Sequence, residues 1–343
     1  MERTTLNIQI KIVWFLLLTA SLLLVCMPRF NRHDWGPIGR LTGKDDQSTG
    51  MGNDSARYIT YVHYLRGNAR FDDLRFPSAY RPLVPMLAML LPFEAMTSIN
   101  IVNFLSLLTT AILLYHLLYF IGFSFHYAIL GSFMFIVSFP TFYYGTVGYV
   151  DPVLILFLTM GLYFLFKKKW AYLILTVMFG YLVKETIVIL IPVSVTFLIL
   201  NREPWKLKSA MLLIVYLSTM LFLRFIFRDV TGTSYLQISL RSFLSNLRVR
   251  ALLSVVLTFG IPGLLSIFFL LRYPVIFNGM NKPVPFSLLF SLVEGILLSM
   301  ALSCYSMFSA HTDGRFIWPS YPFSIPLSLW ALEHLKSRRT GYI

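Results

Sequence analysis

The chain has 343 residues, of which 57% are hydrophobic, 16% aromatic and only 13% charged, whereas a soluble domain carries about 25% charged residues. This shortage of charge excludes a soluble globular enzyme, a disordered protein and a coiled coil. The mean hydropathy of +0.70 is typical of a protein that lies in a lipid bilayer. The net charge is +14, but the basic residues are scattered between apolar runs and form no stripe that could bind a nucleic acid.

The first apolar run, 10–27, follows basic residues as a signal peptide would, but it lacks a cleavage site of small residues. We therefore expect it to be retained as the first membrane span. The two cysteines, Cys26 and Cys304, both lie inside apolar runs. They provide neither a disulfide framework nor the spacing of a Cys/His metal site.

The hydropathy pattern predicts an all-α polytopic membrane protein with a single transmembrane domain over residues 1–343. A helix that crosses the bilayer needs about 20 mainly apolar residues, and this criterion indicates about ten spans. The predicted spans are 10–27, 97–121, 127–144, 151–166, 170–183, 186–200, 208–227, 251–271, 284–304 and 319–334. The sequence shows neither the alternation of a membrane β-barrel nor a repeat of fixed period.

The basic residues of the short loops indicate the orientation, because Lys and Arg concentrate on the cytoplasmic side of membrane proteins. With the N-terminus inside, the cytoplasmic connections hold Lys167, Lys168, Lys169, Arg202, Lys206, Lys208, Arg272 and Lys282. We therefore expect both termini in the cytoplasm and the active site on the opposite side. We expect the inner membrane of a bacterium in preference to the endoplasmic reticulum.

The segment 28–96 is predicted to be a first extracytoplasmic loop of about 69 residues that holds seven of the fifteen acids. Loops of this length are usually functional in compact proteins. Within it, 54–66 is predicted to be a helix on the membrane surface, with its tyrosines at the level of the lipid headgroups. The apolar stretch 82–93 is predicted to re-enter or skim the bilayer, and 228–250 to be a second amphipathic segment, an outer surface helix.

Asp54 stands at the start of the predicted loop helix, where an aspartate commonly caps the free backbone N–H groups. A fixed, ionised carboxylate there could also take a proton from a hydroxyl nucleophile, and the two roles are compatible. Arg81 precedes Pro82 at a second helix start, a position that suits a phosphate group. The alternative for Arg81 is a side chain that reaches the lipid headgroups.

Three further places carry charge near a predicted span. Asp151 precedes Pro152, which fits ordinary capping of a helix. Lys184 and Glu185 separate two apolar runs, so they either line a cavity, as intramembrane charges usually do, or form a plain loop. Near the end, Arg315 could bind phosphate oxygens with two parallel hydrogen bonds, and His311 is either part of that site or a surface histidine.

The segment from Asp54 to Tyr58, followed by Tyr80-Arg81-Pro82-Leu83, resembles the integral membrane glycosyltransferases of the GT-C superfamily. The similarity is closest to the branch of the aminoarabinose lipid A transferases and the protein O-mannosyltransferases. It implies an acidic catalytic base in the first outer loop and a sugar donor on a polyprenyl phosphate. Asp54 matches the base by position, although Ser55 stands where the family often has a second acid and Pro82 where it often has two prolines.

The same resemblance covers two later segments. Gly180 to Thr186 is similar to a family segment in which a lysine, here Lys184, would bind the phosphate of the lipid donor. The segment from His311 to Phe316 is similar to a segment of the mannosyltransferase branches, with Arg315 on the donor phosphate. Thr312 and Asp313 replace the Lys-Glu that normally follows the histidine.

These observations together predict an inverting glycosyltransferase with Asp54 as the general base; the alternative acids are Asp45, Asp46 and Asp151. The residues expected to bind the donor phosphate are Arg57, Arg81, Lys184 and Arg315, and those expected to contact substrate are Tyr58, Tyr80, Glu185 and His311. The expected partners are a polyprenyl-phosphate sugar, a glycan or lipid acceptor and the bilayer, with no nucleic acid. No cofactor is required, although paired acids could bind a divalent metal.

Two other functions stay open. A Wzy-like polysaccharide polymerase is also polytopic, but it would have its main loop late in the chain, whereas the longest loop here follows the first span. A flippase or transporter of lipid-linked sugars would show internal repeats and broken helices at the midplane of the bilayer. The sequence shows no repeat.

Overall fold

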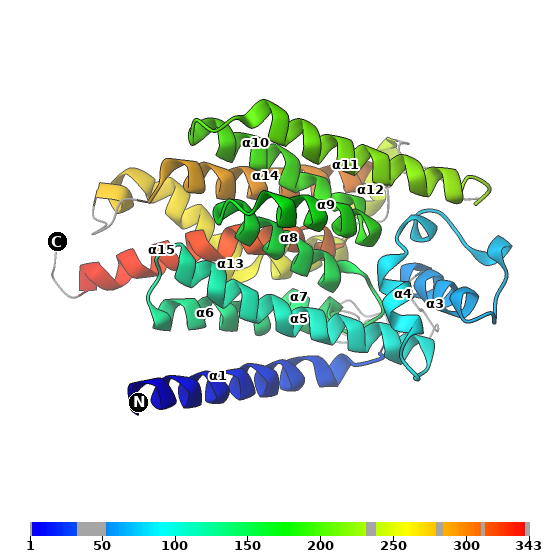
Figure 1. Cartoon of the computed structure of the whole chain (residues 1–343), viewed down its shortest axis with the longest axis horizontal. Helices are drawn as coiled ribbons and strands as arrows, with labels where there is room; N and C mark the ends of the chain where they lie inside the picture. Colours follow the sequence, from blue (N-terminus) through cyan, green and yellow to red (C-terminus); the bar gives the residue numbers. More distant parts are fainter. Residues whose placement is uncertain (1, 33–52, 231–237, 279–283, 310–312, 340–343) are drawn as a thin grey trace.

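The structure is a computed structural model that describes residues 2–32, 53–230, 238–278, 284–309 and 313–339 (Figure 1). These ranges contain helices and no β-strand. The α-helices are α1 (Glu2–Cys26), α3 (Asn53–Leu65), α4 (Leu83–Met89), α5 (Ala95–Phe120), α6 (Phe125–Ile136), α7 (Phe139–Tyr144), α8 (Asp151–Phe166), α9 (Trp170–Val183), α10 (Leu190–Leu200), α11 (Trp205–Ile226), α12 (Leu240–Asn246), α13 (Val249–Asn278), α14 (Phe286–Ser309) and α15 (Tyr321–Arg339). The 3₁₀ turns are η1 (Met27–Arg29), η2 (Phe71–Asp73), η3 (Ser78–Tyr80), η4 (Glu185–Ile189), η5 (Gly314–Phe316) and η6 (Trp318–Ser320).

Five of the described helices are long and apolar enough to cross a membrane. Their apolar windows are Ile12–Arg29, Ala95–Phe120, Trp205–Ile226, Ala251–Arg272 and Phe286–Ser309. Four shorter apolar helices are Phe125–Ile136, Asp151–Phe166, Trp170–Val183 and Glu185–Leu200. The helical class is therefore as the sequence predicts, and the apolar helices indicate a membrane protein, whereas the number of about ten spans stays a prediction.

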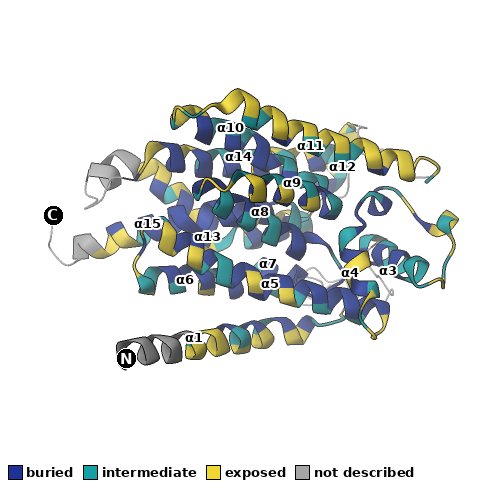
Figure 2. Ribbon diagram, in the orientation of Figure 1, coloured by how far each residue is buried: buried dark blue, intermediate teal, exposed yellow. Residues whose placement is uncertain are grey.

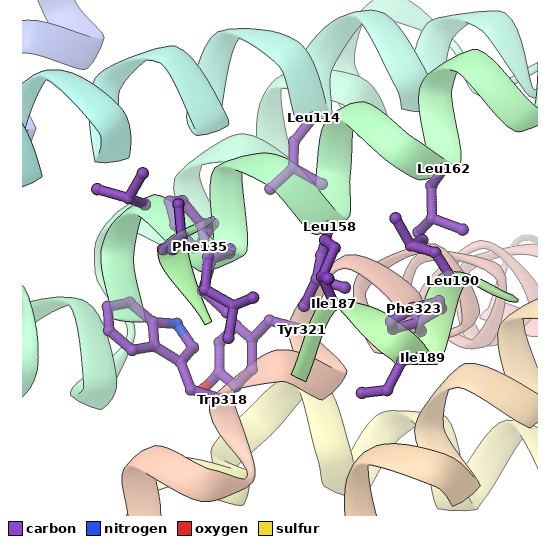
Figure 3. Close-up of a cluster of buried hydrophobic side chains, with 14 of the residues drawn as sticks. Leu114, Phe135, Leu158, Leu162, Ile187, Ile189, Leu190, Trp318, Tyr321 and Phe323 are labelled. Carbon is purple, nitrogen blue, oxygen red and sulfur yellow. The ribbon is translucent and has the colours of Figure 1, made fainter. Parts of the chain in front are cut away.

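The helices α1 and α11 bury the smallest shares of their apolar windows, and most residues of these windows are exposed (Figure 2). A helix that is apolar all round is stable with an exposed surface only where its solvent is lipid. The interior instead collects leucine, isoleucine and aromatic side chains from different helices (Figure 3). Leu114 of α5, Phe135 of α6 and Phe323 of α15 lie among them, all fully buried.

One predicted span, 127–144, is divided in the structure into α6 and α7. Ser138 between them has extended backbone angles, and Pro140 stands in the first turn of α7. Proline suits the first turn of a helix, because its missing N–H would have no partner there. The division at Ser138 lets α7 lead into the loop 145–150 that supports the candidate site.

Helix α13 is broken at Gly260, whose φ of 50° is not helical. Pro262 has no N–H to donate to the carbonyl oxygen of Thr258, one turn earlier. The Tyr321 hydroxyl of α15 donates to that oxygen over 2.8 Å, and the Ser328 hydroxyl donates to the Pro262 carbonyl over 2.6 Å. Helix α15 therefore supplies a donor to the Thr258 carbonyl, which Pro262 leaves without its helical partner, as apolar surroundings require.

The end of the bundle opposite α3 and α4 carries basic residues between its helices (Figure 1). Figure 1 shows the start of α1 and the end of α15 at one end, with α3 and α4 at the other. Helix α8 begins at Asp151, and its 16 residues span about 24 Å before the basic loop that follows it. Glu203, between α10 and α11, pairs with Lys168 of that loop over 2.7 Å and with Lys208 in the first turn of α11 over 2.6 Å.

The outer segments differ in part from the expectations. Tyr58 and Tyr61 of α3 are buried in the protein, so their predicted place among lipid headgroups is wrong; the site of α3 relative to a membrane surface stays a prediction. Helix α4 has seven residues and spans about 10 Å. Of the predicted amphipathic segment 228–250, the described part contains the short helix α12 in place of a helix over the whole stretch.

Candidate functional site

The start of α3 is fixed by a close contact with the loop after α7. The Ser55 hydroxyl donates to the Val147 carbonyl oxygen over 2.7 Å. Gly148 has a φ of +83°, and a Cβ there would lie 2.9 Å from the Met96 sulfur and 3.1 Å from the Ser55 Cβ. Only glycine combines this backbone conformation with so close an approach, so the loop sequence Val147-Gly148 decides where α3 begins.

Buried asparagines hold this loop from the other side. The Asn100 amide oxygen accepts a bond from the Gly148 N–H over 2.8 Å, and the Asn100 amide nitrogen donates to Asn31 over 2.7 Å. Asn103 donates to the Tyr149 carbonyl oxygen over 2.7 Å. The bonds to the Gly148 N–H and the Tyr149 carbonyl oxygen hold the backbone of the loop in place beside the site.

Asp54, in the first turn of α3, forms an ion pair with Arg315 of η5, whose Nη2 lies 2.6 Å from Asp54 Oδ2. Arg57, one turn along α3, has its Nη1 3.7 Å from Asp54 Oδ1. Burial by itself would raise the pKa of Asp54, but the positive charges of Arg315, Arg81 and Lys184 outweigh it and lower the pKa to about 2. Asp54 is therefore ionised at neutral pH.

Arg315 is held in place by its own neighbours. Asp313 Oδ1 accepts the backbone N–H of Arg315 over 3.0 Å and lies 3.3 Å from its Nε. The guanidinium carbon stands 4.3 Å from the centre of the Tyr149 ring, a distance that fits a cation–π contact. Burial raises the pKa of Asp313, Arg315 opposes that rise, and the negative charges of Asp151 and Asp54 add to it.

Lys184 and Asp151 form a second, fully buried pair, with 2.7 Å between Lys184 Nζ and Asp151 Oδ1. Lys184 has extended backbone angles at the break between α9 and η4, and Asp151 is the first residue of α8. The Asp151 side chain is 2% exposed, so the pair shields it from any hydroxyl acceptor. Asp151 is thereby a poor alternative to Asp54 as a base.

Arg81 and Glu185 form the third pair. Arg81 Nε and Nη2 donate to the two carboxylate oxygens of Glu185 over 3.0 and 2.5 Å. Arg81 Nη1 donates to the Tyr58 hydroxyl over 2.9 Å. The residue therefore joins three segments, the η3–α4 turn, η4 and α3, at one point.

The three pairs belong to one electrostatic group at the end of the bundle that holds α3 and α4. Its four acids are Asp54, Asp151, Glu185 and Asp313, and its four bases are Arg57, Arg81, Lys184 and Arg315. The formal charges of these eight residues cancel. All four predicted phosphate-binding residues thus lie together, but each has a carboxylate within 4 Å, so none offers an unpaired positive charge.

The remaining predicted residues lie apart from this group or outside the described ranges. The Tyr80 hydroxyl donates to the Phe227 carbonyl oxygen over 3.3 Å, and its ring packs edge-on against the Phe227 ring, so Tyr80 fastens the loop to the end of α11. Asp45, Asp46 and His311 lie outside the residues that the structure describes.

The sequence interpretation assigned no role to Asp313 or Tyr149, although both position Arg315. For Asp313 a signal was present, since an acid two residues before a candidate phosphate ligand can bind that ligand's backbone N–H. For Tyr149 the sequence holds no such signal. Across the described ranges, no three His, Cys, Asp or Glu side chains are grouped so that they could hold a metal ion, and the question of a divalent metal stays open.

No protein-family model, curated protein or solved structure matches the chain. The geometry of the site therefore carries the functional argument.

Proposed function

We propose that the protein is an inverting glycosyltransferase of the membrane, which moves a sugar from a polyprenyl monophosphate to an acceptor hydroxyl. The acceptor is a glycan or lipid on the side of the membrane opposite the termini, which we place in the cytoplasm of a bacterium. The observation that carries the proposal is the gathering of Asp54, Arg81, Lys184 and Arg315 at one end of an apolar bundle. Perturbed ionisable groups from distant segments cluster at functional sites.

In this proposal Asp54 takes the proton of the acceptor hydroxyl. An aspartate with a pKa of about 2 is a weak base, because efficient proton transfer needs a pKa nearer the working pH. The low value comes from the field of Arg315 and Arg81. A bound phosphate anion offsets that field, so the pKa of Asp54 rises when the donor is present.

The chemical step is a single displacement. The acceptor oxygen forms a bond to the anomeric carbon, the bond from that carbon to the phosphate oxygen breaks, and Asp54 receives the hydroxyl proton. The electron pair of the broken bond stays on the polyprenyl phosphate, whose growing charge Arg81 and Arg315 stabilise in surroundings of low dielectric constant. A single displacement inverts the anomeric configuration.

One observation bears on the alternative of a flippase or transporter. Helix α13 is broken at Gly260, and broken helices are a feature of transporters, in which the freed backbone groups bind the cargo. Here the Tyr321 hydroxyl binds the carbonyl oxygen of Thr258, the group that Pro262 leaves without a helical donor. The break is thus filled by the protein itself, which favours surface chemistry over passage.

The test is transfer of radiolabelled sugar from polyprenyl monophosphate donors by the purified protein in liposomes. We expect Asp54→Asn to lower the rate about 10²- to 10⁴-fold, the usual contribution of a general base. Asp229→Asn is the matched control, because Asp229 is an exposed acid that pairs with its neighbour Arg228. Full transfer by correctly folded Asp54→Asn would remove Asp54 as the base, and labelled donor that crosses the bilayer chemically unchanged would favour the transporter.

A further inference from the structure

Arg81 presents an anion-binding fork that a carboxylate of the same chain fills. Its Nε and Nη2 each donate to one oxygen of Glu185, while Nη1 is held by the Tyr58 hydroxyl. The Arg81 side chain is only 6% exposed. Two parallel N–H donors in this arrangement match carboxylate and phosphate oxygens equally well.

Glu185 is the most exposed acid of the electrostatic group defined above. Its side chain is 46% exposed, against 22% for Asp54 and 19% for Asp313. Its neighbour Lys184 is in extended conformation, which directs successive side chains to opposite sides; Lys184 binds the buried Asp151, and Glu185 faces outward. Of the four acids, Glu185 can therefore turn into solvent at the smallest cost in hydration.

A buried guanidinium that loses its carboxylate must gain another anion, because an uncompensated buried charge is strongly destabilising. We propose that the Arg81 fork is an oxyanion site for a phosphate monoester or diester, and that Glu185 occupies it until the phosphate displaces Glu185 into solvent. This proposal rests on the proposed function for the source of the phosphate, a polyprenyl phosphate donor. Free inorganic phosphate offers the same oxygen atoms to the fork, and the experiment distinguishes it from polyprenyl phosphate.

Binding is measured for two probes, inorganic phosphate in detergent solution and polyprenyl monophosphate in lipid nanodiscs. Glu185→Gln keeps the size of the side chain but removes the competing charge, and we expect it to tighten binding of the phosphate about tenfold, which is close to the lower end of what a hydrogen bond to a charged group contributes. Glu185→Asp keeps the charge but shortens the side chain, so that it cannot reach both donors, and it should also tighten binding of the phosphate.

Arg81→Gln should abolish phosphate binding. Arg81→Lys keeps the charge without the fork and should weaken phosphate binding at least tenfold.

Glu203→Gln is the matched control, because Glu203 also binds two basic side chains but lies in the loops at the opposite end of the bundle. Its phosphate affinity should equal that of the wild type. Thermal unfolding of every variant separates loss of binding from loss of fold.

Unchanged or weaker binding in both Glu185 variants would overturn the proposal, because Glu185 would then support Arg81 instead of competing for it. Tightening in Glu185→Gln alone would also overturn it, since only the total charge would then matter. Binding of inorganic phosphate without polyprenyl phosphate identifies free phosphate as the ligand. If both Glu185 variants bind phosphate more tightly and the Arg81 variants more weakly, but no sugar is transferred, the oxyanion site is supported and the glycosyltransferase activity is rejected. If sugar is transferred but the variants do not change phosphate binding in this way, only the oxyanion site is rejected.

Discussion

Arg315 and Asp54 are 261 positions apart in the sequence, yet Arg315 Nη2 lies 2.6 Å from Asp54 Oδ2. This pair joins η5, which precedes the last helix, to the first turn of α3 in the first long loop. Charge-assisted hydrogen bonds of this kind are short and about twice as strong as neutral ones. The two halves of the candidate site are therefore locked together before any substrate binds.

The ion pair predicts how stability depends on pH. The pKa of Asp54 in the folded protein is about 2, below its ordinary value of 3.8, so its contribution to stability is present above about pH 4 and is lost as the pH falls toward 2. The shift corresponds to about 2 kcal/mol. Chemical unfolding of the wild type and of Asp54→Asn in detergent should give free energies that differ by this amount at pH 6 and converge near pH 2. A difference that does not change with pH would contradict the lowered pKa.

The proposed rise of the Asp54 pKa on donor binding has a kinetic signature. The acid limb of kcat/KM reports the free protein and that of kcat reports the protein with bound substrate. We expect the limb of kcat/KM near pH 2, where free Asp54 titrates, and the limb of kcat at a higher pH. Coincident limbs in transfer assays between pH 2 and 7 would show that the bound phosphate does not act on Asp54.

The buried pair of Lys184 and Asp151 predicts a large loss of stability on removal of one partner. Lys184→Met leaves Asp151 buried without its counter-ion, and such a change costs about 3–5 kcal/mol of the free energy of unfolding. The double variant Lys184→Met/Asp151→Asn removes both charges and should recover most of the loss. Equilibrium unfolding in detergent measures both values; a double variant that is less stable than Lys184→Met would refute the pairing.

Gly148→Ala should displace the start of α3. Its positive φ is unfavourable for alanine by about 1–2 kcal/mol, and the added Cβ would crowd Met96 and Ser55. We expect sugar transfer to fall at least tenfold while the helix content by circular dichroism stays unchanged. Gly122→Ala is the control, since Gly122 also has a positive φ, +105°, but open space around it; it should lose stability and keep its activity. Equal activities of the two variants would exclude the role of this contact.

The orientation is tested by labelling single cysteines with a membrane-impermeant maleimide, in a background with Cys26→Ser and Cys304→Ser. A cysteine in place of Arg57, beside Asp54, should react from outside the cell. Lys168 pairs with Glu203 at the end of the bundle opposite the candidate site, so a cysteine in its place should react only after the membrane is permeabilised. Labelling of both from the same side would invalidate the assignment of the site to the outer face.

Local features of the chain were predictable where the cause is local. The break at Lys184-Glu185 follows from two charges between apolar runs, and the structure indeed ends α9 at Val183 and begins η4 at Glu185. The loop helix was predicted over 54–66 and forms over Asn53–Leu65. The division of 127–144 was missed, because no charged residue interrupts this stretch, and the fall in hydropathy after Val137 and the proline at position 140 were not interpreted as a helix boundary.

The sequence by itself determined that the chain is helical and apolar, and which charged residues interrupt the apolar runs. Only the tertiary structure decided which of those charges meet: Arg81 with Glu185, Lys184 with Asp151, and Arg315 with Asp54. The physical reason is that the helical period and hydropathy depend on neighbours in the chain. The attraction between two charges depends on their separation in space, which is fixed by contacts such as that of Gly148 with Ser55.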